Sequence, residues 1–544
     1  MTAADLRRGK LRRLDQESFD LLVVGGGING AGIAREAALR GLRTALVDKG
    51  DFASGTSSRS SKLVHGGFRY LETGNFGLVL EASRERDLLR RLLAPHLVTP
   101  LQFLFPIYRG GPLPLWKLRL GLLLYDSLAA FRNIGRHRAV RAAAAVGVEP
   151  RLRADGLTGG AVYYDCFTDD ARLVLENILG AEQAGAICLN YASVETFHKD
   201  SGMLVGAAVR DRGDEGGTFR VRARAIVNAA GPWLDHIRTL DDPAARPVLR
   251  PTKGVHVVVP RDRVGNRHAI VLGAVRDGRI LFVIPWEEQT IVGTTDTDYD
   301  GSLDSVAADQ ADVEYLLETV NFYFPQADLR PNDVISTFAG LRPLVAGARP
   351  EAPSEVSRED ALFLSASGLL SLGGGKLTTY RRVAIKVVDR IAAGLRERFG
   401  IDARRHSGTD RIPLPGAIGL IPEASAGDEG DLASFLSRRY GSRAGEVSSM
   451  IAAAKDLAEP IDPEIAELRA QVVFAAGTEM AERVEDVLRR RTTVALKTPD
   501  GGKRIAPRTA ALMAQALGWT RATEERKARE YCDEAEVAPA RRQA

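Results

Sequence analysis

Residues 19–48 read FDLLVVGGGINGAGIAREAALRGLRTALVD, which fits the order strand, glycine turn, helix and second strand ending at an acid. Gly25 allows the tight turn, Gly27 lets the backbone approach a pyrophosphate, and Gly30 lets the helix pack closely on the strand. The pyrophosphate then lies at the positive N-terminal end of the helix. Asp48 is placed to accept hydrogen bonds from ribose hydroxyls, which a glycine turn kept for packing alone does not explain. The stretch predicts a dinucleotide-binding unit.

The next stretch, residues 50–70, reads GDFASGTSSRSSKLVHGGFRY and is rich in glycine and small hydroxyl residues. Such a composition forms neither a good helix nor a good strand. A segment of this kind can pass close to a bulky planar cofactor and hydrogen-bond its phosphates and ring edge. A flexible linker is the alternative, but residues of buried type such as Leu63, Val64 and Phe68 argue against it.

The composition of the 544 residues is that of an ordinary globular protein, with 45% hydrophobic and 26% charged residues. The chain has no run of about 18 apolar residues without a charge, so a membrane-spanning helix is not expected. The N-terminal residues lack the apolar core of a signal peptide. The 74 basic and 70 acidic residues give a net charge of +4, which is too balanced for nucleic acid as the main partner.

Three cysteines, Cys166, Cys188 and Cys532, lie far apart and outside any CxxC pattern. Such sparse cysteines indicate a reducing compartment and no structural disulfide, and they give no support to a metal site. We therefore expect a protein that is cytosolic or faces the cytosol.

Nine ordered motifs give the sequence a family resemblance. They read GGGINGAGIA, TSSRSSKLVHGGFRYLE, YYDCFTDDARLVLEN, NAAGPW, KGVHVVVP, FVIPW, VGTTDTDY, GLRPL and GGGKLTTYR, and DVLRRRT follows near the C-terminus. In this order they resemble the FAD-dependent glycerol-3-phosphate dehydrogenases of the aerobic, quinone-linked type. Asp48 departs from that family, which often has Glu there, but both side chains accept hydrogen bonds from ribose hydroxyls.

The resemblance implies a fold and a reaction. The fold is α/β, with a Rossmann-like FAD-binding domain and an antiparallel-sheet substrate domain in a D-amino-acid-oxidase-like arrangement. The reaction is the oxidation of sn-glycerol 3-phosphate to dihydroxyacetone phosphate by hydride transfer to FAD, with the electrons passed to membrane quinone. The resemblance also implies a cytoplasmic protein attached peripherally to the inner face of the cell membrane, and it leaves a homodimer open.

Strand-like runs at 224–228 and 369–372 each lead into glycine, as the run at 19–24 does. Chain-distant pieces that end in glycine at one cofactor predict a discontinuous domain. The predicted division is an FAD-binding domain of residues 19–90, 155–250 and 335–400, and a substrate domain of residues 91–154 and 251–334, with an antiparallel sheet.

The C-terminal part has a different pattern. Residues 403–430, rich in Pro, Gly, Ser and Asp, are interpreted as a linker. Amphipathic segments within 431–536 predict an all-α C-terminal domain. Asp462 followed by Pro463 predicts the start of one of its helices.

The reaction requires groups that hold a phosphate. The planar guanidinium of arginine binds phosphate oxygens bidentately. Arg69, Arg342 and Arg358 are the candidates, against the alternative of surface ion pairs in an arginine-rich chain. Tyr70 and Thr295 are expected to hydrogen-bond the substrate hydroxyls.

The reaction also requires a base and a group that stabilises the reduced flavin. Histidine suits the base because its ordinary pKa lies nearest neutrality. His256 is the first candidate and His65 is expected to contact the flavin ring, although either histidine could instead be a hydrogen-bonded core residue. Residues 373–380 are expected to open a helix whose N–H groups stabilise negative charge, with Lys376 adding to this or reaching the substrate. A plain glycine turn before a helix is the alternative.

The predicted cofactor ligands extend beyond the first motif, chiefly through the matched family motifs. They are Gly25, Gly27, Gly30, Asp48, Thr56, Ser57, Ser58, Ser61, Lys62, Leu63, His65, Gly66, Val194, Gly231, Gly375, Lys376, Leu377 and Thr378.

Residues 112–125, PLPLWKLRLGLLLY, are apolar with two basic residues and an aromatic anchor. They fit a membrane interface, but the residues alone favour a buried helix of the substrate domain, and it is the family resemblance that favours membrane attachment. Three other functions stay open from the sequence: a glycerol-phosphate oxidase that uses oxygen and releases hydrogen peroxide, an amine or amino-acid oxidase, and a flavin-binding regulatory module without turnover.

Overall fold

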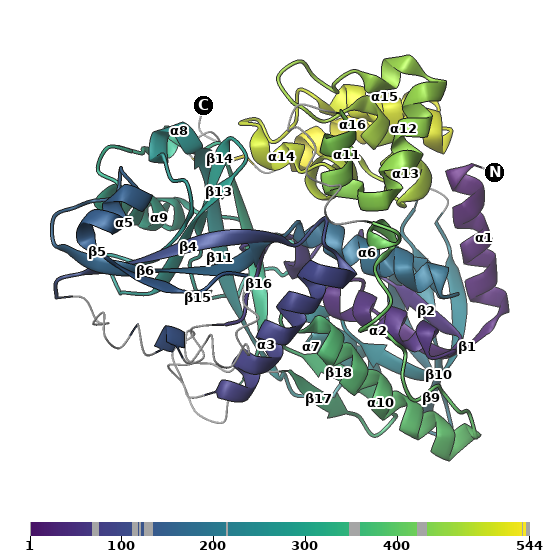
Figure 1. The fold of residues 1–544 in the computed structure, drawn as a ribbon. Coiled ribbons are helices and arrows are strands. Elements are labelled where there is room, and N and C mark those ends of the chain that lie inside the picture. Colours follow the sequence, from purple (N-terminus) through teal and green to yellow (C-terminus); the bar gives the residue numbers. More distant parts are fainter. Residues whose placement is uncertain are drawn as a thin grey trace.

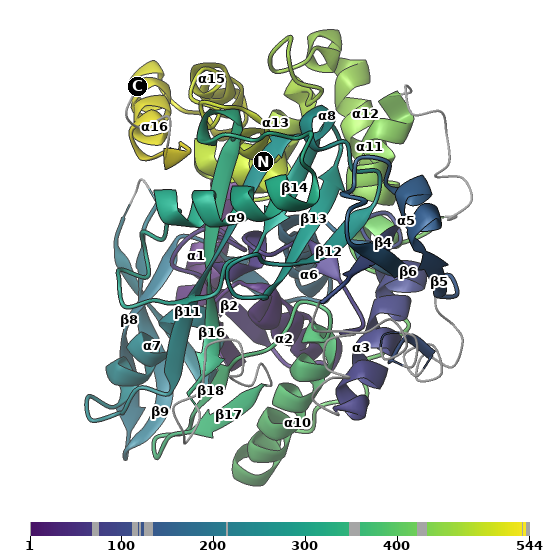
Figure 2. The same ribbon diagram turned by 90° about the vertical axis from the view of Figure 1, so that its left-hand side faces the viewer.

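The computed structural model describes residues 2–67, 75–110, 118, 121–123, 134–213, 216–346, 360–420, 432–535 and 537–539. Within these residues the chain forms two large sheets and a helical part (Figure 1). The C-terminal helices lie above both sheets in the two perpendicular views (Figures 1 and 2). The predicted α/β fold with a helical C-terminal part is confirmed.

The first sheet has a parallel centre, in the strand order β18-β10-β1-β2-β7. Val24 pairs with Asn228 on one side and with Val47 on the other, so three carboxyl ends lie together. Antiparallel strands extend this centre: β17 pairs with β18, and β9 pairs with β10 and in turn with β8. The strands are β1 (Ser18–Val24), β2 (Thr44–Val47), β7 (Ile187–Leu189), β8 (Ala192–Asp200), β9 (Met203–Asp211), β10 (Thr218–Asn228), β17 (Ala361–Leu364) and β18 (Leu369–Gly373).

Both faces of this sheet are covered, which explains why β1 is buried continuously from Phe19 to Val24 and why its last four residues are all apolar rather than alternating. Leu21 and Val23 pack against helices on one face, whereas Leu22 and Val24 pack on the other face. The helices of the first face are α2 (Ile28–Leu39), α6 (Asp170–Gln183) and α10 (Tyr380–Phe399), and those of the second are α1 (Ala3–Gln16) and α7 (Leu234–Asp241).

The second sheet has the strand order β15-β11-β14-β13-β12-β4-β6-β3, with β16 beside β11 and β5 beside β6. All its pairs are antiparallel except β12 with β4, in agreement with the predicted antiparallel sheet. Its strands are β3 (Leu63–Val64), β4 (Thr99–Tyr108), β5 (Arg138–Arg141), β6 (Leu157–Phe167), β11 (Leu249–Pro260), β12 (Ala269–Gly273), β13 (Ile280–Trp286), β14 (Gln289–Gly293), β15 (Thr297–Asp298) and β16 (Ser336–Val345).

Three strands of this sheet, β3, β6 and β16, fall in ranges that were expected to belong to the cofactor domain. β6 and β16 join the second sheet because each forms a long antiparallel ladder there, β6 with β4 and β16 with β11, and the short β3 pairs with β6. Further helices accompany the two sheets: α3 (Phe76–Leu88), α5 (Ala142–Val148), α8 (Arg261–Val264) and α9 (Gln310–Tyr323).

The C-terminal part has its own apolar core. Its helices are α11 (Leu432–Tyr440), α12 (Ala444–Ala453), α13 (Arg469–Thr478), α14 (Val494–Lys497), α15 (Ala506–Leu517) and α16 (Arg521–Glu534), with a π-helical segment at Asp486–Arg491. The helix start predicted at Asp462 is wrong. Asp462 accepts a bond from the Glu464 N–H in a turn, and a bridge between Pro460 and Leu468 delays the helix to Arg469.

No helix among the described residues is both long enough and apolar enough to cross a membrane. Of the apolar segment 112–125, only 118 and 121–123 are described. Leu118 and Leu122 are buried against the second sheet, and Leu123 is half exposed.

Candidate functional site

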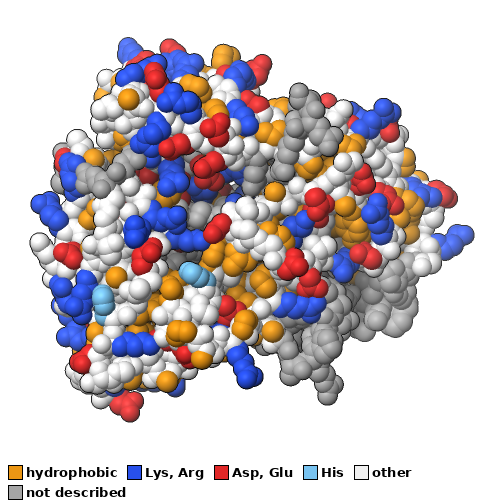
Figure 3. Space-filling view, turned by 180° about the vertical axis from the view of Figure 1, so that it is seen from behind, with side chains coloured by type: hydrophobic (Ala, Val, Ile, Leu, Met, Phe, Trp, Pro, Cys, Tyr) orange, Lys and Arg blue, Asp and Glu red, His pale blue; other side chains and the backbone are white. Residues whose placement is uncertain are grey.

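A pocket of about 720 Å³ lies at the carboxyl ends of the parallel strands, the usual position for ligands of such sheets. Its lining combines residues from widely separated stretches of the chain: 24–29, 47–60, 191–194, 229–237, 303–306, 340–343, 374–377 and 483–490. The face in Figure 3 is hollowed near its centre, and charged side chains of both signs crowd the upper rim of the hollow.

The glycine turn at the pocket has no room for side chains. Gly25 has φ +109°, and a Cβ there would lie 2.6 Å from the carbonyl oxygen of Ala229. A Cβ on Gly30 would lie 1.8 Å from the Gly25 carbonyl oxygen. Gly27 has no side chain with which to cap α2, and Ser57 Oγ accepts a bond from the Ile28 N–H at 3.0 Å, so the N-terminal end of this helix faces the pocket with backbone groups and a hydroxyl.

Asp48 holds the other side of the turn. Its carboxylate accepts bonds from the Gly26 N–H at 2.5 Å and from the Gly50 N–H at 2.8 Å. Burial raises the pKa of Asp48 to about 6, and these two N–H donors oppose the rise only in part. The carboxylate is therefore poorly solvated and suited to accept further hydrogen bonds from a ligand.

These features fit a dinucleotide cofactor. Asn29 lines the pocket, and its buried Oδ1 atom has no hydrogen-bond partner among the described residues. Gly375 approaches the same side chain so closely that a Cβ would lie 2.7 Å from Asn29 Nδ2. A helix N-terminus, a buried acid and this unsatisfied oxygen together match what pyrophosphate and ribose need.

The pocket brings together many of the predicted cofactor ligands. Those in its lining are Gly25, Gly27, Asp48, Thr56, Ser57, Val194, Gly231, Gly375, Lys376 and Leu377. The others lie outside the lining: Gly30, Ser58, Ser61, Lys62, Leu63, His65, Gly66 and Thr378.

Several of these outer residues hold the segment in place. Lys62 Nζ is buried and bonds the Asp170 carboxylate at 2.6 Å. The backbone N–H of His65 donates to Thr378 Oγ1 at 3.1 Å. The Gly66 N–H donates to Asp165 at 3.0 Å.

His256 lies on β11, directly opposite Gly293 of β14 and Phe338 of β16. Its ring stacks on Phe338 with centroids 4.6 Å apart, and its Nε2 atom is 2.8 Å from Ser61 Oγ. Nδ1 is buried without a partner among the described residues. Burial lowers the pKa of His256 to about 3, and the positive charges of Arg342 and Lys62 contribute to this.

Arg342 is fixed on β16 beside His256. Its guanidinium donates to Asp296 at 3.0 Å and to Thr294 Oγ1 at 2.9 Å. The Thr295 hydroxyl accepts a bond from the Val255 N–H at 3.0 Å, so Thr295 also lies next to β11. Three other predicted substrate ligands, Arg69, Tyr70 and Arg358, lie outside the described residues.

Other residues of the lining were missed from the sequence. Lys49 lies 4.1 Å from the ring centroid of Trp233, whose indole N–H donates to Asp304 at 2.9 Å. Arg483 and Arg490 reach the lining from the C-terminal part. The DVLRRRT motif was a signal for this segment, but nothing in it indicates that its arginines meet a loop near the N-terminus. No group of His, Cys, Asp or Glu among the described residues has the arrangement of a metal site.

Residues 20–381 match the family described as FAD dependent oxidoreductase, and residues 407–524 match the C-terminal domain of alpha-glycerophosphate oxidase. A relative from Mycobacterium tuberculosis H37Rv, named glycerol-3-phosphate dehydrogenase 2, is 39% identical over 531 residues, covering 96% of this chain and 88% of the relative. One from Staphylococcus haemolyticus, named aerobic glycerol-3-phosphate dehydrogenase, is 37% identical over 509 residues, 90% of each chain.

A solved structure is similar over the whole molecule. It is the glycerol-3-phosphate dehydrogenase from Bacillus halodurans complexed with FAD, with a TM-score of 0.81 and 34% identity. The match covers 99% of this chain and 98% of that structure.

Proposed function

The chain belongs to the family of FAD-dependent glycerol-3-phosphate dehydrogenases, and from this premise we propose that it oxidises sn-glycerol 3-phosphate to dihydroxyacetone phosphate and passes the electrons to membrane quinone. The observation that carries the proposal is the cradle of Asp48, the glycine turn and the N-terminus of α2. Bound FAD supplies the hydride acceptor, and the protein supplies binding and orientation.

We assign the cofactor to the residues of the cradle. The N-terminal end of α2 with Gly27 holds the pyrophosphate, and Asp48 accepts from the adenosine ribose. Gly231 and Gly375 give the backbone room to approach the cofactor, and Lys376 places a positive charge beside it. The predicted division into an FAD-binding domain, a substrate domain and a helical domain is part of this proposal.

The substrate phosphate is assigned to an arginine clamp. Arg342 is preorganised by Asp296 and Thr294, which leaves its planar fork little freedom to lose on binding. Arg69 and Arg358 complete the clamp in this proposal. Tyr70 and Thr295 bond the substrate hydroxyls.

His256 is proposed as the base. Because burial keeps its imidazole neutral, it is in the form that accepts the C2 hydroxyl proton as the hydride leaves C2. The hydrogen bond with Ser61 and the stacking on Phe338 fix the ring orientation. His65 is proposed to contact the flavin ring.

The test is anaerobic mixing of the purified FAD-bound protein with glycerol 3-phosphate, followed by absorbance at about 450 nm, where oxidised flavin absorbs. We expect the band to bleach and dihydroxyacetone phosphate to accumulate. The reduced protein is then mixed separately with a soluble quinone and with oxygen, and we expect fast reoxidation by the quinone only. Rapid stoichiometric hydrogen peroxide would instead support the oxidase. If glycerol 3-phosphate does not bleach the flavin band, the result would support a flavin-binding module without turnover. If amino acids bleach it, the result would support an amino-acid oxidase.

We further propose that the protein is attached peripherally to the inner face of the cell membrane, where quinone is available. The proposal also includes a homodimer. Co-sedimentation with vesicles of anionic and neutral lipid tests the attachment, and sedimentation velocity tests the dimer. A protein that stays in the supernatant with both vesicles at low ionic strength would contradict the attachment.

A further inference from the structure

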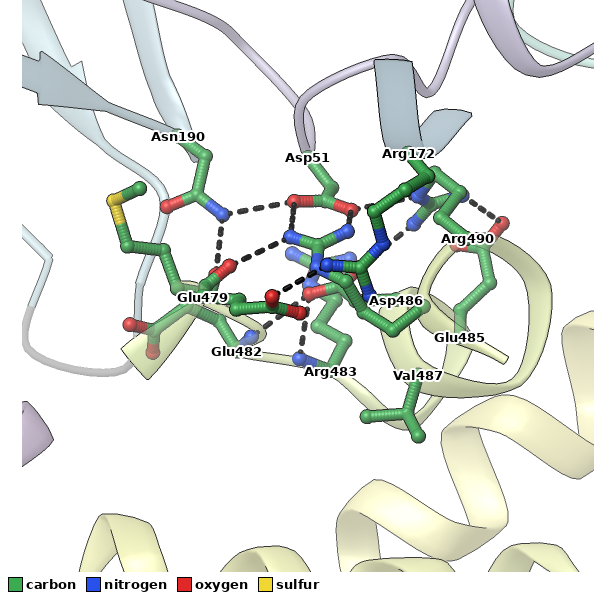
Figure 4. Close-up of polar contacts among 12 residues, drawn as sticks. Asp51, Arg172, Asn190, Glu479, Glu482, Arg483, Glu485, Asp486, Val487 and Arg490 are labelled. Carbon is green, nitrogen blue, oxygen red and sulfur yellow. Dashed lines mark hydrogen bonds and ion pairs between the residues drawn. The ribbon is translucent and has the colours of Figure 1, made fainter. Parts of the chain in front are cut away.

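A buried cluster joins the C-terminal domain to a loop of the FAD pocket (Figure 4). Asp51 follows Asp48 by three residues, and its carboxylate is fully buried. Arg491 binds it through both terminal nitrogens, at 2.8 and 3.0 Å, and Arg490 Nε donates to it at 2.7 Å. Bidentate pairing of this kind fixes direction as well as distance.

The same C-terminal segment holds a second loop of the pocket. Asn190 donates both to Asp51 at 3.0 Å and to the Met480 carbonyl at 2.7 Å. The Tyr191 hydroxyl donates to Asp486 at 2.5 Å, and the Tyr191 backbone N–H donates to the Gly50 carbonyl at 2.9 Å. The two pocket loops are therefore bonded to each other and to the C-terminal segment.

Two guanidinium groups of the cluster face three carboxyl groups, and burial together with the nearby Asp51 raises the pKa of Asp486. Burial alone would raise the pKa of Asp51, but Arg491 and Arg490 outweigh it and hold the pKa below its ordinary value. Arg490 also bonds Asp486 at 2.7 Å and Glu485 at 3.1 Å. Each charge therefore has a partner, and removing one would leave the others buried and uncompensated.

Simple docking of the C-terminal domain does not explain the position of this cluster. Another buried pair, Arg172 with Glu479 at 2.5 Å, already joins α6 to the C-terminal domain. It adjoins the cluster, because Arg491 also donates to the Glu479 carbonyl at 2.9 Å. That pair lies outside the pocket lining, whereas Arg490 lies in it together with Arg483 and Glu485.

We infer that the C-terminal domain completes the FAD site: the Asp51–Arg490–Arg491 cluster positions the Asp48–Asp51 loop for the adenosine half of the cofactor. Arg491 acts as a positioning residue through Asp51. Because linkage is reciprocal, bound FAD in turn stabilises the C-terminal segment in its docked place.

The first test compares two matched substitutions, Arg491→Lys in the cluster and Arg172→Lys in the other interdomain pair. Both replace a buried guanidinium that joins the same two parts of the protein. Titration of each apoprotein with FAD, followed by flavin fluorescence, is expected to give a Kd raised roughly tenfold for R491K and nearly unchanged for R172K. ADP carries the adenosine half alone, and its binding is expected to weaken by the same factor in R491K.

Equal loss of affinity in the two variants would overturn the inference, because the cluster would then act only through domain docking. An unchanged Kd in R491K would overturn it as well. Neither measurement uses glycerol 3-phosphate, so a failure of the proposed reaction leaves this test intact.

The second test uses the unaltered protein and does not depend on a variant folding. Hydrogen–deuterium exchange is measured on the apoprotein with and without FAD. Slower exchange at residues 479–492 on adding FAD, alongside residues 25–30, is expected. Protection of residues 25–30 with no change at 479–492 would overturn the inference.

Discussion

Ligand binding and protonation are coupled at Asp48. Its pKa, raised from 3.8 to about 6, means that ionising the buried carboxyl costs the folded apoprotein about 3 kcal/mol relative to the unfolded chain. The apoprotein therefore loses this stability as the pH rises from 3.8 to about 6. A ligand that donates hydrogen bonds to the carboxylate offsets the cost.

The corresponding prediction concerns FAD affinity as a function of pH. Ribose hydroxyls favour the ionised form, so affinity should be full above pH 6 and fall by up to roughly tenfold per unit below it. Asp48→Asn should bind FAD roughly tenfold more weakly at pH 8 and lose this dependence. Fluorescence titrations between pH 5 and 8 measure both. The same pH slope in D48N and in the unaltered protein would contradict the assignment.

His256 gives a second prediction at the residue scale. With its pKa lowered to about 3, the imidazole stays neutral well below pH 6.5, so kcat should show no acid limb from this group between pH 5 and 7. His256→Gln should lower kcat roughly 100-fold with a parallel pH profile. His268→Gln, which alters a histidine that directly precedes β12 and is paired with Glu149, is the control. An acid limb near pH 6.5 that vanishes in H256Q would contradict the low pKa.

At the scale of elements, the contact between α2 and β1 limits which residues the turn tolerates. Gly30→Ala would place a methyl group against the Gly25 carbonyl, backbone that has no space to move. We expect a loss of stability of about 3 kcal/mol and no measurable FAD binding.

The control for this change is Gly9→Ala in α1, where a Cβ would meet nothing within 4 Å. Removing a helical glycine there should stabilise the protein by about 0.5–1 kcal/mol. Urea unfolding and FAD retention measure both variants. FAD binding by G30A at the level of the unaltered protein would contradict the packing described at the turn.

The elements that the sequence predicted best are those whose contacts are local. β1, α2 and β2 follow one another within thirty residues, and their glycines and apolar residues carry the pattern directly. The helix expected at Asp462 failed because a bridge between Pro460 and Leu468 competes with the local capping signal. The pairing of β6 and β16 depends on partners elsewhere in the chain, which no local pattern identifies.

At the scale of the whole molecule, buried ion pairs join parts of the protein that are far apart in the sequence. Glu479 is buried between Arg172 at 2.5 Å and Arg443 at 3.3 Å. Burial opposes its ionisation, but these arginines outweigh burial and lower the pKa of Glu479. The depressed pKa means that the stabilisation is present above pH 4.5 and is lost as the pH falls through the folded value.

We therefore expect acid to release the C-terminal domain before the two sheets unfold. Limited proteolysis with an acid-active protease, carried from pH 7 to well below pH 4.5, should show no change above pH 4.5 and should cut the C-terminal helices first as the pH falls further. Glu479→Gln should lower stability by about 3 kcal/mol at pH 7 and abolish this dependence on pH. Release with the same pH dependence in E479Q would contradict the assignment to Glu479.

Separation along the chain also explains why one part of the site was not predicted from the sequence. The glycine turn and Asp48 belong to one continuous motif and were found, whereas Asp51 and Arg491 are 440 positions apart. A carboxylate next to a cofactor motif and a run of three arginines each look like ordinary surface charge. Only the folded arrangement makes them partners.

The strand order of the first sheet also has a consequence for how the protein is made. Synthesis runs from the N-terminus, so β1 and β2 emerge from the ribosome long before β10, and β18 follows later still. Until β10 has been made, the edge of β1 that pairs with β10 has no partner strand and is open to association with other chains. The cofactor can be taken up only after nearly the whole chain has been translated. Slower translation or folding assistance should therefore raise the yield of active protein more than added flavin does.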